Sequence, residues 1–138
     1  MSTLKDQLIL HEDIRLKPYV DSVGKVTIGV GRNLDDKGIS MVTALQMMDE
    51  DIVECTHDLE KFDWFLDLDY IRQRVLLDMR FNMGPHRFRG FKKMLAAIEE
   101  GRFSDAAEEM LDSVWAKQVK TRAYRLAKMM KEGKDYSD

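Results

Sequence analysis

The apolar residues of the chain recur mainly with the spacing of α-helices. Near the N-terminus, two leucines lie four positions apart in a segment that Thr3 can cap, with Asp6 three residues later. This pattern predicts a first helix up to about Glu12, which places Glu12 near the C-terminal end of that helix. Pro18 would mark the exit from this helical region.

Between residues 25 and 31, KVTIGVG, the spacing changes to the period of two that is typical of a β-strand. The turn sequence DSVG at residues 21–24 precedes it, so we expect a short β-hairpin. Thr27 would lie on the face opposite the three alternating apolar residues, Val26, Ile28 and Val30. Gly29 and Gly31 would leave space for another backbone or a ligand to come close.

Helical spacing returns after the hairpin and continues to the C-terminus. Ser40 can cap a long helix that runs to about Leu59. A second long helix, with apolar residues from Ile71 to Met83, would be stopped by Gly84-Pro85. Shorter helices are predicted from the capping and terminating residues Gly101, Ser104, Ser113, Thr121, Lys131 and Gly133.

The order of these elements predicts an α+β fold that is mostly α-helical. No internal repeat or flexible linker separates independent domains, so we expect one domain over residues 1–138. Its small N-terminal lobe, about residues 1–60, would contain the hairpin and be joined by the Ser40-capped helix to a helical lobe, about 61–138. The first helix could pack on the C-terminal lobe, and a cleft between lobes is a natural ligand site.

Composition favours a soluble globular protein. Hydrophobic residues make up 44% and charged residues 34%, and no apolar run approaches the roughly 20 residues of a membrane span. The N-terminus lacks the pattern of a secretory signal, so export unaided is not expected. Cys55 is the only cysteine, which fits a reducing cytoplasm and a role in packing on a helix face.

Charge is distributed unevenly along the chain. Residues 1–60 contain six Lys/Arg and twelve Asp/Glu, a net charge of −6, whereas residues 61–138 contain sixteen and thirteen, a net charge of +3. A positive face in the second half could attract an anionic polymer, although a solvated helical surface explains it equally well. A helix-turn-helix DNA-binding protein is a remote alternative, and we expect no nucleic-acid partner.

Two carboxylates, Glu12 and Asp21, could lie on the rim of one cleft. Glycoside hydrolysis uses such a pair of carboxyl groups in unlike environments. One is protonated and donates its proton to the leaving oxygen, and the other is ionised and activates water or stabilises positive charge on the sugar. The spacing alone is not specific, because 25 acidic residues would provide similar pairs by chance.

The surrounding sequence is more specific. Residues 12–31, EDIRLKPYVDSVGKVTIGVG, closely resemble the catalytic segment of T4-type phage lysozymes (endolysins), glycoside hydrolase family 24. The resemblance extends to FNMG at residues 81–84 with Phe91, and to SVWAKQVKTRA at residues 113–123. It implies a lysozyme-like fold over nearly the whole chain.

The resemblance implies Glu12 as the general acid, Asp21 as the second carboxylate and Thr27 as the hydroxyl that helps to hold the attacking water. Without it, Thr27 would be read as a β-branched residue filling a strand. The sequence departs from the commonest pattern at Asp13, where many members have Gly, and at Arg32, where many have His.

Three further residues are implied as supporting or substrate-binding. Arg122 matches the arginine that approaches the catalytic Glu, Phe81 matches a residue lining the sugar cleft, and Gly31 belongs to the matched Thr-Ile-Gly-x-Gly motif. Core packing is an equal alternative for Phe81. Trp115, in the same block as Gln118, is expected to anchor the helical core.

The resemblance implies hydrolysis of the β-1,4 bond between N-acetylmuramic acid and N-acetylglucosamine in peptidoglycan. A lytic transglycosylase, or a wall-binding module without catalysis, is the alternative. We expect a monomer without a cofactor. We also expect no metal, because the three histidines lack the spacing of metal ligands. It would stay in the host bacterial cytoplasm until a holin releases it to the cell wall or periplasm, without stable membrane insertion.

Overall fold

The computed structural model describes residues 1–137, and the chain forms two compact units, Met1–Met47 and Met48–Asp138. Within the described residues there are eight α-helices and one three-stranded antiparallel sheet, which confirms the predicted α+β, mostly helical fold. The division between the units falls within α3 (Met41–Leu59). Ser40 caps this helix as predicted, since its hydroxyl accepts the N–H of Thr43 at 3.1 Å.

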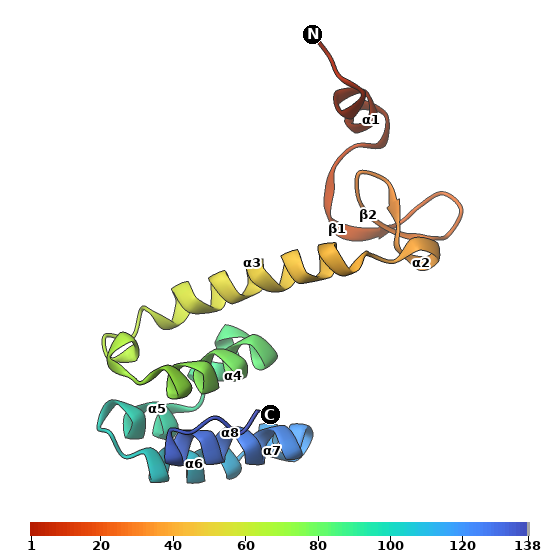
Figure 1. The fold of residues 1–138 in the computed structure, drawn as a ribbon. Coiled ribbons are helices and arrows are strands. Elements are labelled where there is room, and N and C mark those ends of the chain that lie inside the picture. The colour runs from red at the N-terminus through yellow and green to blue at the C-terminus, as the bar shows by residue number, and fades with distance from the viewer. Residues whose placement is uncertain (138) are drawn as a thin grey trace. The chain divides into compact units, whose positions relative to one another are not determined.

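The first unit contains the predicted helix and hairpin (Figure 1). Helix α1 (Leu4–Glu12) begins with the Thr3–Asp6 capping box and is followed by β1 (Arg15–Val20), β2 (Val26–Gly29) and β3 (Arg32–Asn33). The strands lie in the order β1-β2-β3, so β2 is central, and the short helix α2 (Leu34–Lys37) follows. Neither β3 nor α2 was predicted from the sequence.

Thr27 lies at the middle of this sheet. It pairs with Tyr19 of β1 and Asn33 of β3 and is 3% exposed, which makes it the only buried side chain in residues 1–47. Thr27 therefore occupies the buried face of β2, Val26 and Ile28 beside it are half-buried, and Val30 lies outside the strand. Pro18 lies within β1 instead of at a helix exit, and an edge strand tolerates a residue without an N–H donor.

The second unit is helical and contains the main hydrophobic core. After α3 come a 3₁₀ turn (Phe65–Asp67) and the helices α4 (Tyr70–Arg89), α5 (Lys92–Glu99), α6 (Phe103–Leu111), α7 (Val114–Val119) and α8 (Thr121–Glu132). Trp115 is 2% exposed, as expected for a core anchor, and Cys55 on α3 is also buried. The largest fully buried side chains include Phe65, Leu76, Met79, Phe88, Met94, Met110 and Met130.

Several predicted helix ends differ from the structure. Gly84 interrupts α4 with a φ of 85°, but the helix resumes at Pro85 and continues to Arg89. Ser104 and Thr121 were expected to cap helices and instead lie in the first turns of α6 and α8, which have no side-chain cap. Ser113 does cap α7, and Gly133 ends α8 in a left-handed conformation.

A charged cluster ties α3 to α4 inside the second unit. The Asp58 carboxylate accepts hydrogen bonds from Arg80 and from Arg89, each at 2.7 Å. The Arg80 side chain is only 8% exposed and also lies 3.6 Å from the Cys55 sulfur. Hydrogen bonding from Arg89, and then from Arg80, lowers the pKa of Asp58 to about 2, although burial opposes this shift.

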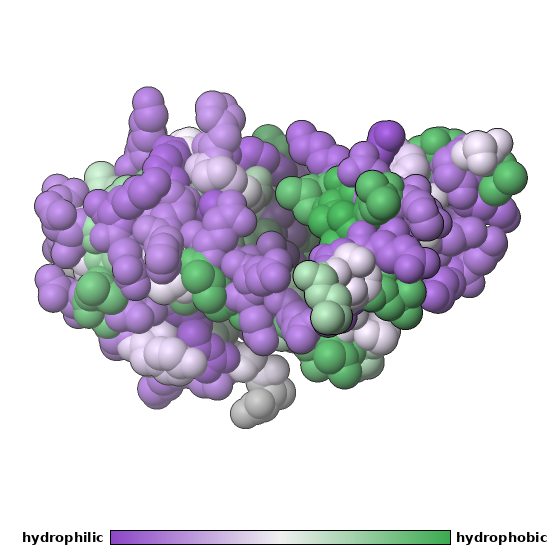
Figure 2. Space-filling view, turned by 90° about the horizontal axis from the view of Figure 1, so that it is seen from above, coloured by the Kyte–Doolittle hydropathy of each residue, from purple (hydrophilic) through white to green (hydrophobic). Residues whose placement is uncertain are grey.

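The surface is mixed in polarity. Apolar side chains gather in patches between larger polar areas on the face shown in Figure 2. Among the helices of residues 1–137, none combines the length and apolar character that a membrane span needs.

Candidate active site

Asp21 and Thr27 are joined through the backbone of Lys25. The Asp21 N–H donates to the Lys25 carbonyl oxygen at 2.9 Å, and the Thr27 hydroxyl donates to the same oxygen, also at 2.9 Å. The Lys25 N–H in turn donates to Asp21 Oδ1 at 2.9 Å. One peptide carbonyl therefore accepts both the Thr27 hydroxyl and the Asp21 backbone N–H, while the Asp21 carboxylate is held by the N–H groups of the turn.

This bonding leaves specific atoms free to contact a ligand. Asp21 Oδ1 accepts N–H groups from Val23 and Lys25, whereas Oδ2 has no hydrogen-bond partner within residues 1–137. The Thr27 hydroxyl donates its proton to the Lys25 carbonyl oxygen, so the lone pairs of the hydroxyl oxygen can still accept a hydrogen bond.

Glu12 lies at the end of α1 against the turn between β2 and β3. A Cβ atom placed on Gly31 would be 2.6 Å from Glu12 Oε2, which is closer than real Cβ contacts allow. Gly31 also has a φ of +64°. The close neighbour of Gly31 is therefore the carboxylate of the predicted general acid, and not the other backbone or ligand that was expected, while a Cβ on Gly29 would meet nothing within 4 Å.

We expect Gly31→Ala to lower hydrolytic activity about 100-fold, because the new methyl group must displace the Glu12 carboxylate from its place. Gly29→Ala is the matched control, since its φ is +69° but its Cβ would meet nothing within 4 Å. Both variants should lose stability by about 1 kcal/mol from the positive φ. Equal activities for the two folded variants, measured on peptidoglycan, would contradict a role for the Gly31–Glu12 contact.

Asp13 follows Glu12 in an unusual backbone conformation. Its φ of 68° and ψ of 169° lie in a region that is essentially reserved for glycine. Its N–H donates the last hydrogen bond of α1 to the Ile9 carbonyl oxygen at 2.8 Å. Its Oδ1 accepts the N–H of Ile14 at 2.8 Å. Glycine would adopt this conformation without strain, in agreement with the family pattern that the sequence resembles.

We therefore expect Asp13→Gly to raise the free energy of unfolding by about 1 kcal/mol, because relief of backbone strain exceeds the added entropy of the unfolded chain. Urea unfolding would measure this change. Asp13→Ala, which keeps the strain and loses the bond to Ile14, should be less stable than the natural chain. A glycine variant that unfolds more readily would show that the side-chain bond outweighs the strain.

Phe81 and Arg122, predicted as supporting residues, lie in the second unit and line one cavity of about 370 Å³. Phe81 is 44% exposed, more than a residue of the core, and its predicted role in the sugar cleft stays a prediction. Arg122 donates from Nε and Nη2 to Asp78 Oδ1, at 2.9 and 2.5 Å. Its predicted approach to Glu12 stays a prediction.

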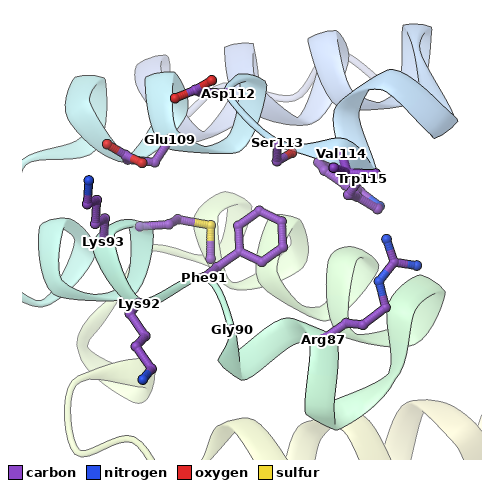
Figure 3. Close-up of a pocket in the computed structure, with 11 residues that line it drawn as sticks. Arg87, Gly90, Phe91, Lys92, Lys93, Glu109, Asp112, Ser113, Val114 and Trp115 are labelled. Carbon is purple, nitrogen blue, oxygen red and sulfur yellow. The ribbon is translucent and has the colours of Figure 1, made fainter.

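A second cavity, of about 500 Å³, lies between α5, α6 and α7 (Figure 3). Phe91 packs against Trp115 with the ring planes at 86° and the centroids 6.2 Å apart. The lining carries charges of both signs, and Lys93 lies opposite Glu109 at one end of the cavity while Arg87 lies at the other end. The cavity can therefore contact a polar ligand that has charges of both signs.

Three residues of these sites were not found from the sequence. Asp78 is 44 positions from Arg122, and nothing in its surroundings distinguishes it from other acidic residues. Asp35 and Asp36 contact the catalytic hairpin from α2, an element that the sequence did not predict. The only available signal was their place just after Asn33, which caps α2.

Comparison with known proteins matches residues 10–131 to the family model described as phage lysozyme. Probable T4-type lysozymes 1 and 2 of Dictyostelium discoideum are 28% and 27% identical to the chain over 163 aligned positions, covering 96% of each protein. The pre-baseplate central spike protein Gp5 of Enterobacteria phage T4 is 25% identical over 95% of this chain, but only 28% of Gp5 is covered.

The alignments with the two Dictyostelium proteins are longer than this 138-residue chain, so these relatives contain residues that the chain lacks. The family match nevertheless spans the segment with Glu12, Asp21 and Thr27 as well as the helical second unit. Because it covers most of the chain, the protein belongs to the phage lysozyme family and is a lysozyme-like cell-wall hydrolase.

Proposed function

We propose that this protein is a muramidase that hydrolyses the β-1,4 bond between N-acetylmuramic acid and N-acetylglucosamine in bacterial peptidoglycan. The observation that carries the proposal is that the Asp21 backbone N–H and the Thr27 hydroxyl bond to the same Lys25 carbonyl, while Asp21 Oδ2 and a lone pair of the Thr27 hydroxyl are not used by these bonds. Family membership supports the substrate class.

In the proposed reaction, Glu12 protonates the glycosidic oxygen as the bond from that oxygen to the sugar C1 breaks. A water held by Thr27 and Asp21 attacks C1 from the other side. Its proton passes to Asp21 Oδ2, so the products are two free sugar ends and no covalent intermediate forms. This single displacement inverts the configuration at C1, in agreement with the usual outcome in the family that the sequence resembles.

The second unit also has surfaces that suit a peptidoglycan ligand. Phe81 can cover the apolar side of a sugar ring, as the resemblance implies, and its exposure at the cavity shared with Arg122 supports this role. Peptides of the cell wall contain both carboxylates and amines, so the charged walls of the cavity between α5, α6 and α7 also suit this polymer.

Mass spectrometry of the fragments released from purified peptidoglycan tests the reaction. Hydrolysis predicts reducing N-acetylmuramic acid ends that have gained water, from the natural chain but not from Asp21→Asn. Anhydro-sugar ends that persist in Asp21→Asn would identify a lytic transglycosylase instead. If the folded natural chain binds peptidoglycan and releases no fragments, the protein is a binding module.

A further inference from the structure

The peptide group between Lys25 and Val26 links the catalytic turn to α2. Its carbonyl oxygen is the acceptor on which the Asp21 N–H and the Thr27 hydroxyl converge. Its N–H, on Val26, donates to Asp35 Oδ2 at 2.8 Å. A peptide group is planar, so a bond that fixes the direction of the N–H also fixes the direction of the carbonyl.

The strand β3 ends too early to accept the Val26 N–H, and the Asp35 side chain accepts it instead. The β2–β3 ladder pairs Ile28 with Arg32 and Thr27 with Asn33, and the chain then turns into α2 at Leu34. Val26 therefore lies beyond the last pair of the ladder. An oxygen of the Asp35 side chain supplies the acceptor for the Val26 N–H at this place.

The position of Asp35 is itself fixed by its neighbours. The Asn33 side chain accepts the Asp36 N–H at 3.0 Å and donates to the Asp36 carboxylate at 2.9 Å. Asp36 also forms an ion pair with Lys25 Nζ at 3.2 Å. Two adjacent carboxylates of α2 thus contact Lys25 and Val26, the same two residues whose peptide group orients the turn.

We propose that Asp35 is a positioning residue for Asp21 and Thr27, acting through the Lys25–Val26 peptide group. This inference rests on the proposed function. Asp35 does not contact the substrate. It sets the direction of the carbonyl that accepts the Thr27 hydroxyl and the Asp21 backbone N–H, so its loss should slow the chemical step and leave substrate binding largely unchanged.

The test compares Asp35→Ala and Asp35→Asn with the natural chain on soluble glycan fragments of peptidoglycan. For Asp35→Ala we expect kcat to fall about tenfold with KM within about twofold, because the turn shifts without losing its binding surface. Asp35→Asn retains an acceptor oxygen and should recover kcat to within about threefold of the natural value. Asp105→Ala is the control, since Asp105 is also an exposed residue in the first turn of a helix.

Amide hydrogen exchange by NMR provides a readout that does not require activity. We expect the Val26 amide to exchange faster in Asp35→Ala, with chemical-shift changes at the Asp21 and Thr27 amides, and natural behaviour in Asp35→Asn and Asp105→Ala.

Natural kcat in Asp35→Ala, or an equal loss in Asp35→Asn, would overturn the inference. A natural chain that hydrolyses nothing would instead refute the proposed function. Positioning is then judged by NMR alone: shift changes that reach Asp21 and Thr27 support it, and changes confined to residues 26 and 35 overturn it.

Discussion

Glu12→Gln is expected to lower the rate of peptidoglycan hydrolysis about 1000-fold, because the amide cannot donate a proton to the glycosidic oxygen. This loss corresponds to about 4 kcal/mol of transition-state stabilisation. Release of reducing ends from purified peptidoglycan at saturating substrate would measure it. The side chain keeps its size, so binding to the polymer should change little.

The same substitution should leave the fold intact. The Glu12 carboxylate has no hydrogen bond or ion pair in the part of the chain that the structure describes, and only the close approach to Gly31 constrains it. Equal thermal unfolding temperatures for the variant and the natural chain would separate lost chemistry from lost structure. Glu50→Gln, at an exposed position of α3, is the matched control and should remain fully active. Appreciable activity in Glu12→Gln would assign the proton donor to another group.

The second large effect concerns stability. Asp58→Ala is expected to lower the free energy of unfolding by about 3 kcal/mol, because it leaves the nearly buried guanidinium of Arg80 without its main partner. Glu54 lies 3.8 Å from Arg80 but is exposed and cannot replace the lost hydrogen bonds. Chemical denaturation monitored by tryptophan fluorescence would measure the change.

Asp135→Ala provides a contrast, because hydrogen bonds from Ser137, and then from Arg74, lower the pKa of Asp135 to about 2 as well. This pair is open to solvent, which screens it, so we expect little loss of stability. A similar loss in both variants would show that burial does not decide the strength of these pairs.

Acid unfolding tests the same cluster through the protonation of Asp58. The folded-state pKa of about 2 lies below the ordinary value of 3.8, so protonation disfavours the folded state. The stabilisation is complete above about pH 4 and should be lost as pH falls towards 2, by about 2 kcal/mol. The difference in stability between the natural chain and Asp58→Ala should shrink over this range.

Several helix boundaries could be predicted because their signals are local. Thr3 and Asp6 form a capping box three residues apart, and Gly133 ends α8 with a backbone conformation that glycine adopts readily. Ser104 and Thr121 show the limit of this approach. A hydroxyl residue near a helix start is equally acceptable within the first turn, so the residue type does not fix the boundary.

The candidate site could be predicted only in part. The resemblance of residues 12–31 to T4-type lysozymes identified Glu12, Asp21 and Thr27, whose roles stay predictions until the variants are measured. It did not indicate that Thr27 is the buried residue of its unit. That burial follows from its central place in a three-stranded sheet, and β3 is too short to be recognised as a strand from sequence.

By itself, the sequence determined the helical periodicity, the hairpin, several helix caps and the family to which the chain belongs, because each depends on residues a few positions apart or on a continuous motif. The tertiary structure decided which charged and polar groups meet. Asp58 pairs with Arg80 and Arg89, Arg122 with Asp78, and Asp35 with the Val26 N–H. With 25 acidic and 22 basic residues, composition permits many such pairings, and only the path of the folded backbone selects among them.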